Sequence, residues 1–184
     1  EARRRRGRFG EMSQVSEWFQ EHGPRVWRTL ARFGVPASDL EDALQETFVV
    51  AHRRSVDYDP TRAAPTTWLL GIAYRVAADF RRKAKRYADP HQDDDRIDPA
   101  AGPEGELVQK QQATLLAEAL EALGEEKRAA FVLYEIEELE CPEIAQILSV
   151  PLGTVHSRLH QARADLEKFL RRADALDDAK VRRR

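Results

Sequence analysis

The residues best suited to chemistry lie in the last helical pattern of the sequence, residues 152–172. Apolar residues recur there every three or four positions and predict one buried helical stripe: Leu152, Val155, Leu159, Ala162 and Leu166. Side chains that hydrogen-bond readily occupy the other positions: Thr154, His156, Ser157, Arg158, Gln161 and Arg163. Arg and Gln can bond base edges in the major groove, while Ser and Thr can bond phosphates or bases. The pattern therefore predicts a DNA-reading face.

A shorter helix must precede this face and hold it. PEIAQILS, residues 142–149, has its own apolar face and places Pro142 in a favourable first-turn position. The junction Ser149-Val150-Pro151 is short enough to set two helices at a steep angle, as in a helix-turn-helix. An ordinary helical hairpin with a solvated outer face is the alternative. His156 and His160 are four residues apart, as metal ligands can be, but the sequence places no carboxylate beside them, so no metal site is predicted.

Composition limits what the rest of the chain can be. The chain has 184 residues and a net charge of −2, with 42% hydrophobic and 34% charged residues, which fits a protein of amphipathic helices. Residues 1–86 hold 17 Lys and Arg against 11 Asp and Glu, so the small total hides a basic half. The one cysteine, Cys141, excludes an internal disulfide and a cysteine-based zinc site. No apolar run reaches the roughly 18 residues of a membrane span, and we expect a cytoplasmic protein.

The acidic, Pro- and Gly-rich segment 88–106 divides the chain, and we expect it to be a flexible linker. Helical periodicity predicts three helices before it, with a kink or break at Gly23-Pro24 and an N-cap at Ser38 or Asp39, and four helices after it. No stretch alternates as a strand would, so the predicted fold class is all-α with two small helical domains. The predicted divisions are a disordered basic extension (1–13), a first domain (14–87), the linker (88–106), a second domain (107–172) and a C-terminal tail (173–184).

Two sets of motifs resemble one family. ALGEEKRAAFVLYEIEELECPEIAQILSVPLGTVHSRLHQARADL resembles region 4 of bacterial RNA-polymerase sigma factors of the extracytoplasmic-function (ECF) group, most specifically in its GTV-x-SRL-x-x-AR core. DLEDALQETFVVAHRR and YDPTRAAPTTWLLGIAYRVAADFRRKAKR resemble region 2 of the same family. The two sets stand in the family's order, on either side of the predicted linker. The resemblance implies a three-helix-type region 2 bundle and a four-helix region 4 domain containing a helix-turn-helix.

The resemblance also implies binding roles. One set matches the segment that docks on the clamp helices of the polymerase β′ subunit: Asp42, Gln45, Glu46 and Phe48. A second matches the part that opens promoter DNA and contacts the −10 element: Trp68, Tyr74, Arg75, Arg81, Arg82, Lys83, Lys85 and Arg86. The face at 154–163 corresponds to −35 recognition. Asp42 and Glu46 are one turn apart and would form one acidic patch, which suits a basic partner.

Family resemblance further implies core RNA polymerase (β′ clamp helices and β flap), promoter DNA and an anti-sigma factor as partners, with no cofactor and no enzymatic activity. Family members often have Asn at the position of Arg75 and Arg at that of Gln161, so the promoter preference does not transfer directly. One alternative is a free-standing regulator that uses only the helix-turn-helix. Another is a metal nuclease that uses Asp39, Asp42 and Glu46.

Overall fold

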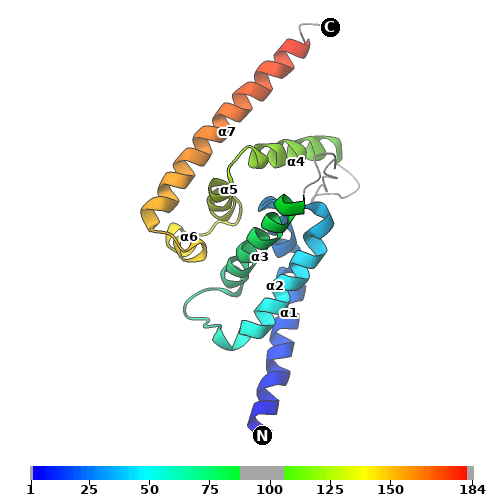
Figure 1. The fold of residues 1–184 in the computed structure, drawn as a ribbon, viewed down its shortest axis with the longest axis vertical. Coiled ribbons are helices and arrows are strands. Elements are labelled where there is room, and N and C mark those ends of the chain that lie inside the picture. The colour runs from blue at the N-terminus through cyan, green and yellow to red at the C-terminus, as the bar shows by residue number, and fades with distance from the viewer. Residues whose placement is uncertain (1, 88–105, 182–184) are drawn as a thin grey trace. The chain divides into compact units, whose positions relative to one another are not determined.

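The computed structural model describes residues 2–87 and 106–181, and every regular element in these two ranges is helical (Figure 1). The chain divides into two compact units, one for each of these ranges. The predicted all-α class with two helical domains is therefore confirmed. The predicted linker lies outside the described residues up to position 105, and Glu106 begins a helix. Within the described ranges, no helix has the length and apolarity that a membrane span would require.

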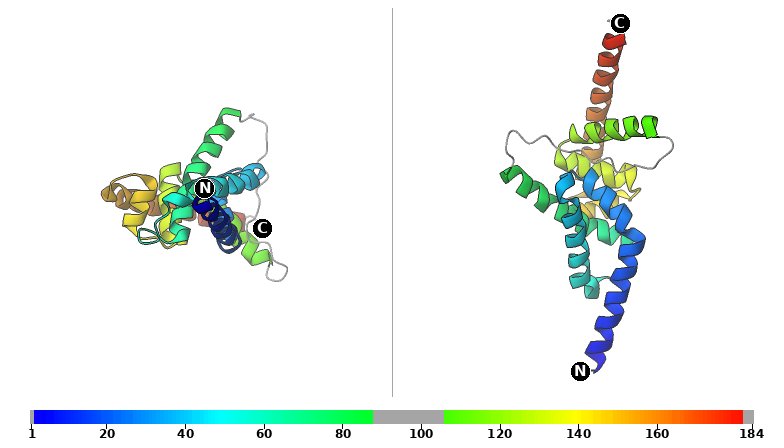
Figure 2. Two further views of the ribbon diagram at one scale, coloured as in Figure 1. Left: turned by 90° about the horizontal axis from the view of Figure 1, so that it is seen from below. Right: turned by 90° about the vertical axis from the view of Figure 1, so that its right-hand side faces the viewer.

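The first unit is a bundle of three helices, α1 (Ala2–Arg32), α2 (Leu40–Arg54) and α3 (Pro65–Tyr87), each packed against the other two (Figure 2). Short 3-10 turns at Ala37–Asp39 and Ser55–Asp57 precede and follow α2. The helices join through apolar stripes at helical spacing, as the sequence predicted. The most deeply buried members are Val26, Leu30, Phe33, Leu40, Ala43, Leu69, Leu70 and Ala73.

Helix α1 is longer and less interrupted than the sequence predicted. It continues through Gly23 and Pro24, where a kink or break was expected, so the helix is not broken there. Buried residues on both sides of Pro24, Trp18 before it and Val26 after it, keep one packed stripe, and that packing outweighs the hydrogen bond lost at proline. The backbone is also helical from Ala2, where a disordered extension was expected. The Arg-rich composition of this stretch suits a helix, because Arg has a high helix propensity.

A Schellman turn ends α1, and a side chain of α3 bonds to the backbone at this end. Gly34 has a φ of 86°, its N–H donates to the Ala31 carbonyl (2.9 Å), and the Val35 N–H donates to the Leu30 carbonyl (3.2 Å). Arg81 of α3 donates from Nη1 to the carbonyl of Phe33 at 2.6 Å. This contact closes the end of α1 against α3.

Entry into α2 is simpler than the sequence suggested. Asp39 stands at the N-cap position, but its side chain makes no capping hydrogen bond, and the preceding 3-10 turn leads directly into the helix. Ser38 donates instead to the Asp39 carboxylate at 3.2 Å. The predicted cap position is therefore right, while the predicted capping bond is absent.

The second unit contains α4 (Glu106–Glu121), α5 (Glu125–Phe131), α6 (Cys141–Leu148) and α7 (Leu152–Val181), with a π-helical turn at Val132–Ile136 after α5. Helix α7 runs nine residues past the predicted end at Arg172. Gly124, three residues after the end of α4, occupies the N-cap position of α5. The core gathers apolar residues of all four helices and the turn: Leu120, Leu123, Ala130, Val132, Leu133, Ile144, Val155, Leu159 and Ala162.

The α6–α7 pair forms the predicted helix-turn-helix. Glu140 and Glu143 make a capping box before α6, and Pro142 lies in its first turn. Ser149 ends α6 in the left-handed region at φ 55°, and the Val150 N–H donates to the Ala145 carbonyl at 3.0 Å. The next helix starts within three residues, so the turn leaves little freedom in the angle between α6 and α7.

The packing predicts a large stability loss from one substitution in the first unit. Leu30→Ala, at a fully buried position, should lower the free energy of unfolding by about 2–5 kcal/mol. Urea unfolding followed by tryptophan fluorescence reports on this unit alone, because Trp18, Trp27 and Trp68 all lie in it. Val56→Ala, at a 69% exposed position, is the control and should change stability by less than about 0.5 kcal/mol. Equal effects of the two substitutions would contradict this packing.

Candidate nucleic-acid interface

A groove of about 590 Å³ runs between α2 and α3 in the first unit. Residues on α3 recur every three or four positions along one wall, and α2 supplies the other wall. The lining residues are Asp42, Gln45, Glu46, Val49, Val50, Arg54, Ile72, Arg75, Val76, Asp79, Phe80, Arg82, Lys83 and Arg86. The groove combines apolar residues with acidic side chains from both helices and basic side chains mainly from α3.

This groove brings together two of the predicted sets. Asp42, Gln45 and Glu46, predicted for polymerase docking, are exposed on α2. Four of the residues predicted for promoter DNA line the same groove from α3: Arg75, Arg82, Lys83 and Arg86. The structure therefore places carboxylates and guanidinium groups on neighbouring helices of one surface, where a partner with mixed charge can contact both.

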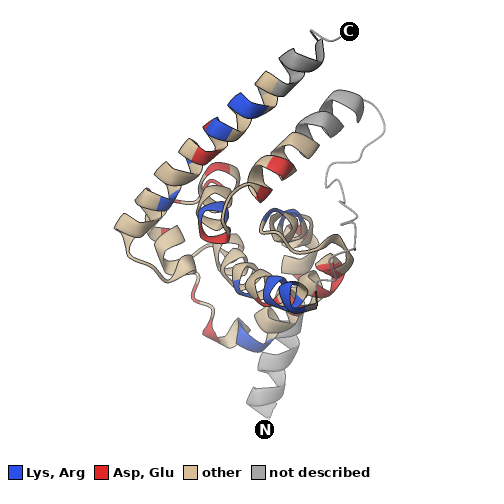
Figure 3. Ribbon diagram, turned by 45° about the horizontal axis from the view of Figure 1, so that its top comes forward, with Lys and Arg blue, Asp and Glu red and all other residues tan. Residues whose placement is uncertain are grey.

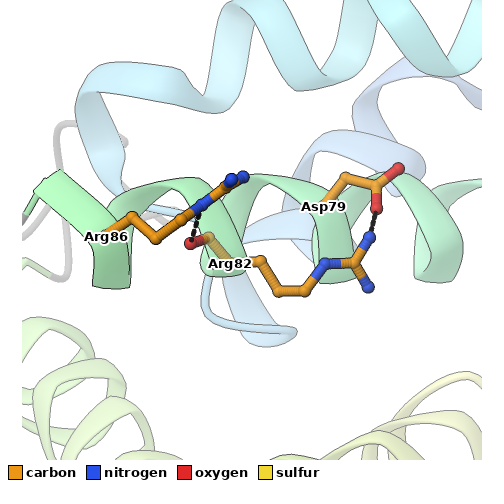
Figure 4. A network of polar contacts seen from close by, with 3 residues as sticks. All are labelled: Asp79, Arg82 and Arg86. Atoms are coloured by element: carbon orange, nitrogen blue, oxygen red, sulfur yellow. Dashed lines mark hydrogen bonds and ion pairs between the residues drawn. The ribbon is translucent and has the colours of Figure 1, made fainter.

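Local contacts hold several of the α3 cations in place. Arg82 pairs with Asp79 one turn earlier, and Arg86 donates from Nε to the Arg82 carbonyl at 3.3 Å (Figure 4). The Lys83 ammonium lies 5.0 Å from the centre of the Phe80 ring. Arg75 donates to the Gly71 carbonyl at 3.0 Å. These contacts keep the basic side chains along the surface of α3, near Asp79 and the helix backbone.

Two residues of the predicted sets lie in the interior. Phe48, 7% exposed, packs edge-on against Phe19 with ring centres 5.0 Å apart. Arg81, 8% exposed, is the residue that bonds the end of α1. Both positions are thus committed to packing within the unit. The other predicted cations near the end of α3, Arg82, Lys83, Lys85 and Arg86, are exposed.

The aromatic residues predicted to face an unpaired base are also engaged within the unit. Trp68 lies 5.6 Å from Trp18 and 5.3 Å from Tyr58, measured between ring centres. Tyr74 lies 5.7 Å from Phe33. Each of the two rings is half-buried, so the packing leaves only part of its surface for a partner.

The aromatic cluster also supports the loop before α3, which the sequence-based set did not include. Tyr58 donates to the Ala63 carbonyl at 3.1 Å, and burial raises the pKa of its hydroxyl. Asp59 accepts hydrogen bonds from the hydroxyl (2.7 Å) and the N–H (2.9 Å) of Thr61, which lower its pKa. An Asp followed by Pro and Thr is a turn signal, so this loop shape could have been anticipated.

In the second unit, α7 carries the residues predicted to form a DNA-reading face. Val155, Leu159 and Ala162 of the predicted apolar stripe are buried. Leu152, the first residue of α7, is 43% exposed and Leu166 is half-buried, so the prediction of a buried stripe is wrong at Leu152 and holds only in its middle part. His156, Ser157 and Gln161 are exposed and Thr154 is half-buried. His160 is exposed as well and belongs to the same side, one turn after His156.

The two arginines of this set are tied to neighbouring segments. Arg158, with 13% of its side chain exposed, pairs with Glu126 of α5 at 2.8 Å. Arg163 donates from Nε and Nη2 to the same oxygen of Glu135, at 2.9 and 2.7 Å, and these bonds raise its pKa. Its guanidinium also lies 5.5 Å from the centre of the Tyr134 ring. Both arginines therefore contact their own unit.

Metal ligation receives no support from the described residues, which contain no group of three or more His, Cys, Asp and Glu side chains able to hold an ion. The predicted linker contains three consecutive carboxylates, Asp93, Asp94 and Asp95, which lie outside the described part of the chain. Cys141 is a half-buried free thiol at the start of α6.

Comparison with known proteins gives two family matches in chain order. The family described as Sigma-70 region 2 matches residues 18–87, and Sigma-70 region 4 matches residues 113–166. An ECF RNA polymerase sigma factor SigE of Mycolicibacterium smegmatis is 34% identical over 168 residues, and the match covers 88% of this chain but only 64% of that relative. The ECF RNA polymerase sigma-E factor of Escherichia coli K12 is 31% identical over 144 residues, covering 72% of this chain and 74% of the relative.

Solved structures share the fold. CnrH, in complex with the cytosolic domain of CnrY, matches with a TM-score of 0.66 and 24% identity, covering 90% of this chain and 92% of CnrH. The sigma factor RpoE of Bartonella quintana, in complex with the anti-sigma factor NepR, matches with a TM-score of 0.69 and 19% identity, covering 86% and 97%. These matches support the two-domain helical architecture.

The ion pair between Lys127 and Asp165 connects α5 to α7 and gives a pH-dependent prediction. The hydrogen bond from Lys127 lowers the pKa of the Asp165 carboxyl. A carboxyl with a lowered folded-state pKa stabilises the fold above its unfolded value of about 3.9, and this contribution is lost as the pH falls through the folded value. Lys127→Met should therefore raise the Asp165 midpoint toward that of an ordinary aspartate.

Titration of the side-chain carboxyl carbons by NMR measures this midpoint directly. Asp59, whose pKa is lowered by Thr61 in the other unit, is the internal control and should titrate identically in both proteins. An unchanged Asp165 midpoint in the Lys127→Met variant would show that the pair does not form in solution.

Proposed function

Because the chain belongs to the sigma-70 family, within the ECF group of RNA-polymerase sigma factors, we propose that it binds core polymerase and directs promoter-specific initiation. It would act as a dissociable, non-catalytic subunit, in the cytoplasm where the polymerase works. One observation carries the proposal beyond family membership. The α2–α3 groove is lined by three of the four residues proposed for polymerase docking, Asp42, Gln45 and Glu46, and by several of those proposed for promoter DNA, Arg75, Arg82, Lys83 and Arg86.

Docking would use the α2 side of the groove. Asp42 and Glu46 are exposed one turn apart, and Gln45 lies between them in the sequence. Two carboxylates in this arrangement suit a basic surface on the polymerase clamp helices, where they would set orientation and association rate more than total affinity. Val49 and Val50 continue the same wall and add apolar contact area. Phe48 supports this face from beneath through its contact with Phe19.

Promoter opening would use the end of α3. The exposed cations there are Arg82, Lys83, Lys85 and Arg86. Several cations close together at one helix end suit contact with a phosphate backbone. Figure 3 colours the Lys and Arg positions of the ribbon blue. Arg75, farther back on α3, lines the groove close to the docking residues. Arg81 would act indirectly, by fixing the end of α1 against α3. Trp68 and Tyr74 would chiefly shape the surface from the aromatic packing described above.

Recognition of the −35 element would use the N-terminal half of α7. In a helix-turn-helix, the second helix enters the major groove with its first turns nearest the bases. Thr154, His156, Ser157 and Gln161 occupy these turns. The unit would also contact the polymerase β flap, so that each DNA-binding unit is held near its element by the same scaffold.

An anti-sigma factor is the third proposed partner. The two matching structures contain CnrH with the cytosolic domain of CnrY, and RpoE with the anti-sigma factor NepR. We expect an inhibitor of this chain to cover the α2–α3 groove, because occupation of that surface blocks polymerase docking.

The alternative readings have less support. A free-standing regulator would not require a region 2 domain, and the region 2 match covers residues 18–87. A metal nuclease would require converging carboxylates, but Asp39 does not line the groove that contains Asp42 and Glu46. The sigma-factor function therefore accounts for more of the chain than either alternative.

The docking proposal predicts a selective loss of polymerase binding. Reversing both carboxylates, Asp42→Lys with Glu46→Lys, should weaken binding to bacterial core polymerase by about 10-fold or more, because two attractive contacts become repulsive. Fluorescence anisotropy of the labelled chain titrated with core polymerase measures the affinity.

A matched control changes the net charge equally elsewhere on the same unit. Glu21→Lys with Glu41→Lys reverses two exposed carboxylates that do not line the groove. Binding within about threefold of the unmodified chain is expected, since only general charge effects remain. Equal losses in the two double variants would rule out the groove as the docking site.

The promoter-opening proposal predicts a change in salt dependence. Lys83→Gln with Arg86→Gln should reduce the slope of log affinity against log salt by about 1.4–1.8, because each of the two phosphate contacts contributes roughly 0.7–0.9. The affinity of the chain–polymerase complex for forked promoter DNA, measured across a salt series, gives the slope. Arg28→Gln with Arg53→Gln, at exposed positions outside the groove, should leave it unchanged. An unchanged slope in the first variant would remove these two residues from the DNA interface.

A further inference from the structure

The polar residues in the N-terminal half of α7 divide into two groups by the direction in which they face. Arg158, Arg163 and Asp165 contact α5 or the π-helical turn that follows it. His156, Ser157, His160 and Gln161 are exposed and appear in none of these pairs. The first group flanks the buried Val155–Leu159–Ala162 stripe, where α7 packs against α5.

Arg158 is the most strongly committed of the three. Only 13% of its side chain is exposed, although arginine is among the residues least often buried. Its guanidinium pairs with Glu126, whose own side chain is 71% exposed. A contact from Arg158 to DNA would require it to leave this burial and leave Glu126 unpaired near the phosphates. Both changes oppose DNA binding.

Arg163 is held by several contacts at once. Two nitrogens donate to one oxygen of Glu135, and the guanidinium lies over the Tyr134 ring. Bonds of this charge-assisted kind restrict both the position and the plane of the guanidinium. The side chain is 54% exposed, so solvent screens the pair more than it screens Arg158.

We propose that Arg158 and Arg163 are positioning residues that set the orientation of α7 through Glu126 and Glu135. Recognition of the −35 base sequence is then carried out by one exposed strip of α7, which consists of His156, Ser157, His160 and Gln161. His160 thereby becomes a DNA-contacting residue, and the two arginines cease to be direct contacts. This inference rests on the proposed −35 recognition by α7.

The geometry of the strip supports this assignment. Positions 156, 157, 160 and 161 follow the i, i+1, i+4, i+5 spacing of one helix face, which is narrow enough to enter a major groove. Histidine can donate or accept through its ring nitrogens, and glutamine can bond adenine at two atoms. The strip thus holds enough hydrogen-bonding groups to distinguish bases without an arginine.

Substitution of the acidic partners Glu126 and Glu135 changes DNA affinity in opposite directions for a positioning arginine and for a DNA-contacting arginine. The full chain with core polymerase selects duplexes from a pool randomised at the −35 position, and affinities are then measured on the selected sequence. If Arg158 positions α7, Glu126→Gln and Arg158→Gln should each weaken DNA binding about 5- to 10-fold. The variant with both substitutions should then bind DNA at least as tightly as the single variant with the lower affinity, because both substitutions break the same ion pair. If Arg158 contacts DNA, Glu126→Gln should tighten binding, because it frees a cation and removes a negative charge. Glu135 and Arg163 provide the same cycle independently.

Glu125→Gln is the matched control, since it removes one negative charge from the adjacent position of α5 without removing the Glu126 pair. A positioning arginine should also leave the salt slope unchanged, whereas loss of a phosphate contact lowers it by about 0.9. The selected sequence is a second readout that does not depend on how much protein is folded. His160→Ala should abolish the preference at one base position and leave the others, a change that lost stability cannot produce.

Tighter binding by Glu126→Gln and Glu135→Gln, or a salt slope lowered by the arginine substitutions, would overturn the positioning role. An unchanged base preference in the His160→Ala variant would contradict the assignment of His160 to the strip that recognises bases. Failure of the proposed function looks different from either result. In that case the unmodified chain with polymerase selects no −35 sequence at all.

Discussion

Burial of one apolar stripe on each helix constrains every surface that this chain can offer a partner. On α7, Val155 and Ala162 are fully buried, so the residues between them must face outward or sideways. On α2, burial of Ala43, Thr47 and Ala51 leaves Asp42 and Glu46 on the opposite side. The binding faces are therefore what remains after the cores have formed. A change in stripe register would move every proposed contact residue, even with its identity unchanged.

Electrostatics then selects among the residues that remain outside. Several cations have acidic partners in their own unit, as Arg82 has Asp79 and Arg163 has Glu135. Such pairing reduces the net positive field around these cations, which would limit indiscriminate binding of this chain, with its net charge of −2, to nucleic acid. Affinity would come from tethering two modest DNA contacts to one polymerase, since a shared scaffold raises their effective concentration. Specificity can then depend on a few side chains.

Much of this arrangement could be predicted from the sequence, because helical periodicity is a local signal. The stripe on α7, the short turn after α6 and the exposed carboxylates of α2 all follow from spacing alone. The errors arise where distant residues decide the outcome. Helix α1 passes through Pro24 because packing on both sides stabilises it, and Phe48 and Arg81 are interior because of contacts with Phe19 and Phe33. The partners of Arg158 and Arg163 were equally invisible, since each lies about 30 residues away in the sequence. A periodic pattern shows that a residue leaves the core, but it does not show which neighbour that residue then meets.

In the proposed function, the chain gives core polymerase a promoter preference through both of its units. Transcription by bacterial core polymerase from a pool of promoter fragments, with and without the purified chain, tests it most directly. Sequencing of the transcript 5′ ends should reveal start sites that depend on the chain and share two upstream elements, at the −10 and −35 positions. If the transcripts match those of core polymerase alone, while the chain by itself binds specific DNA, the sigma-factor account is contradicted and a free-standing regulator takes its place.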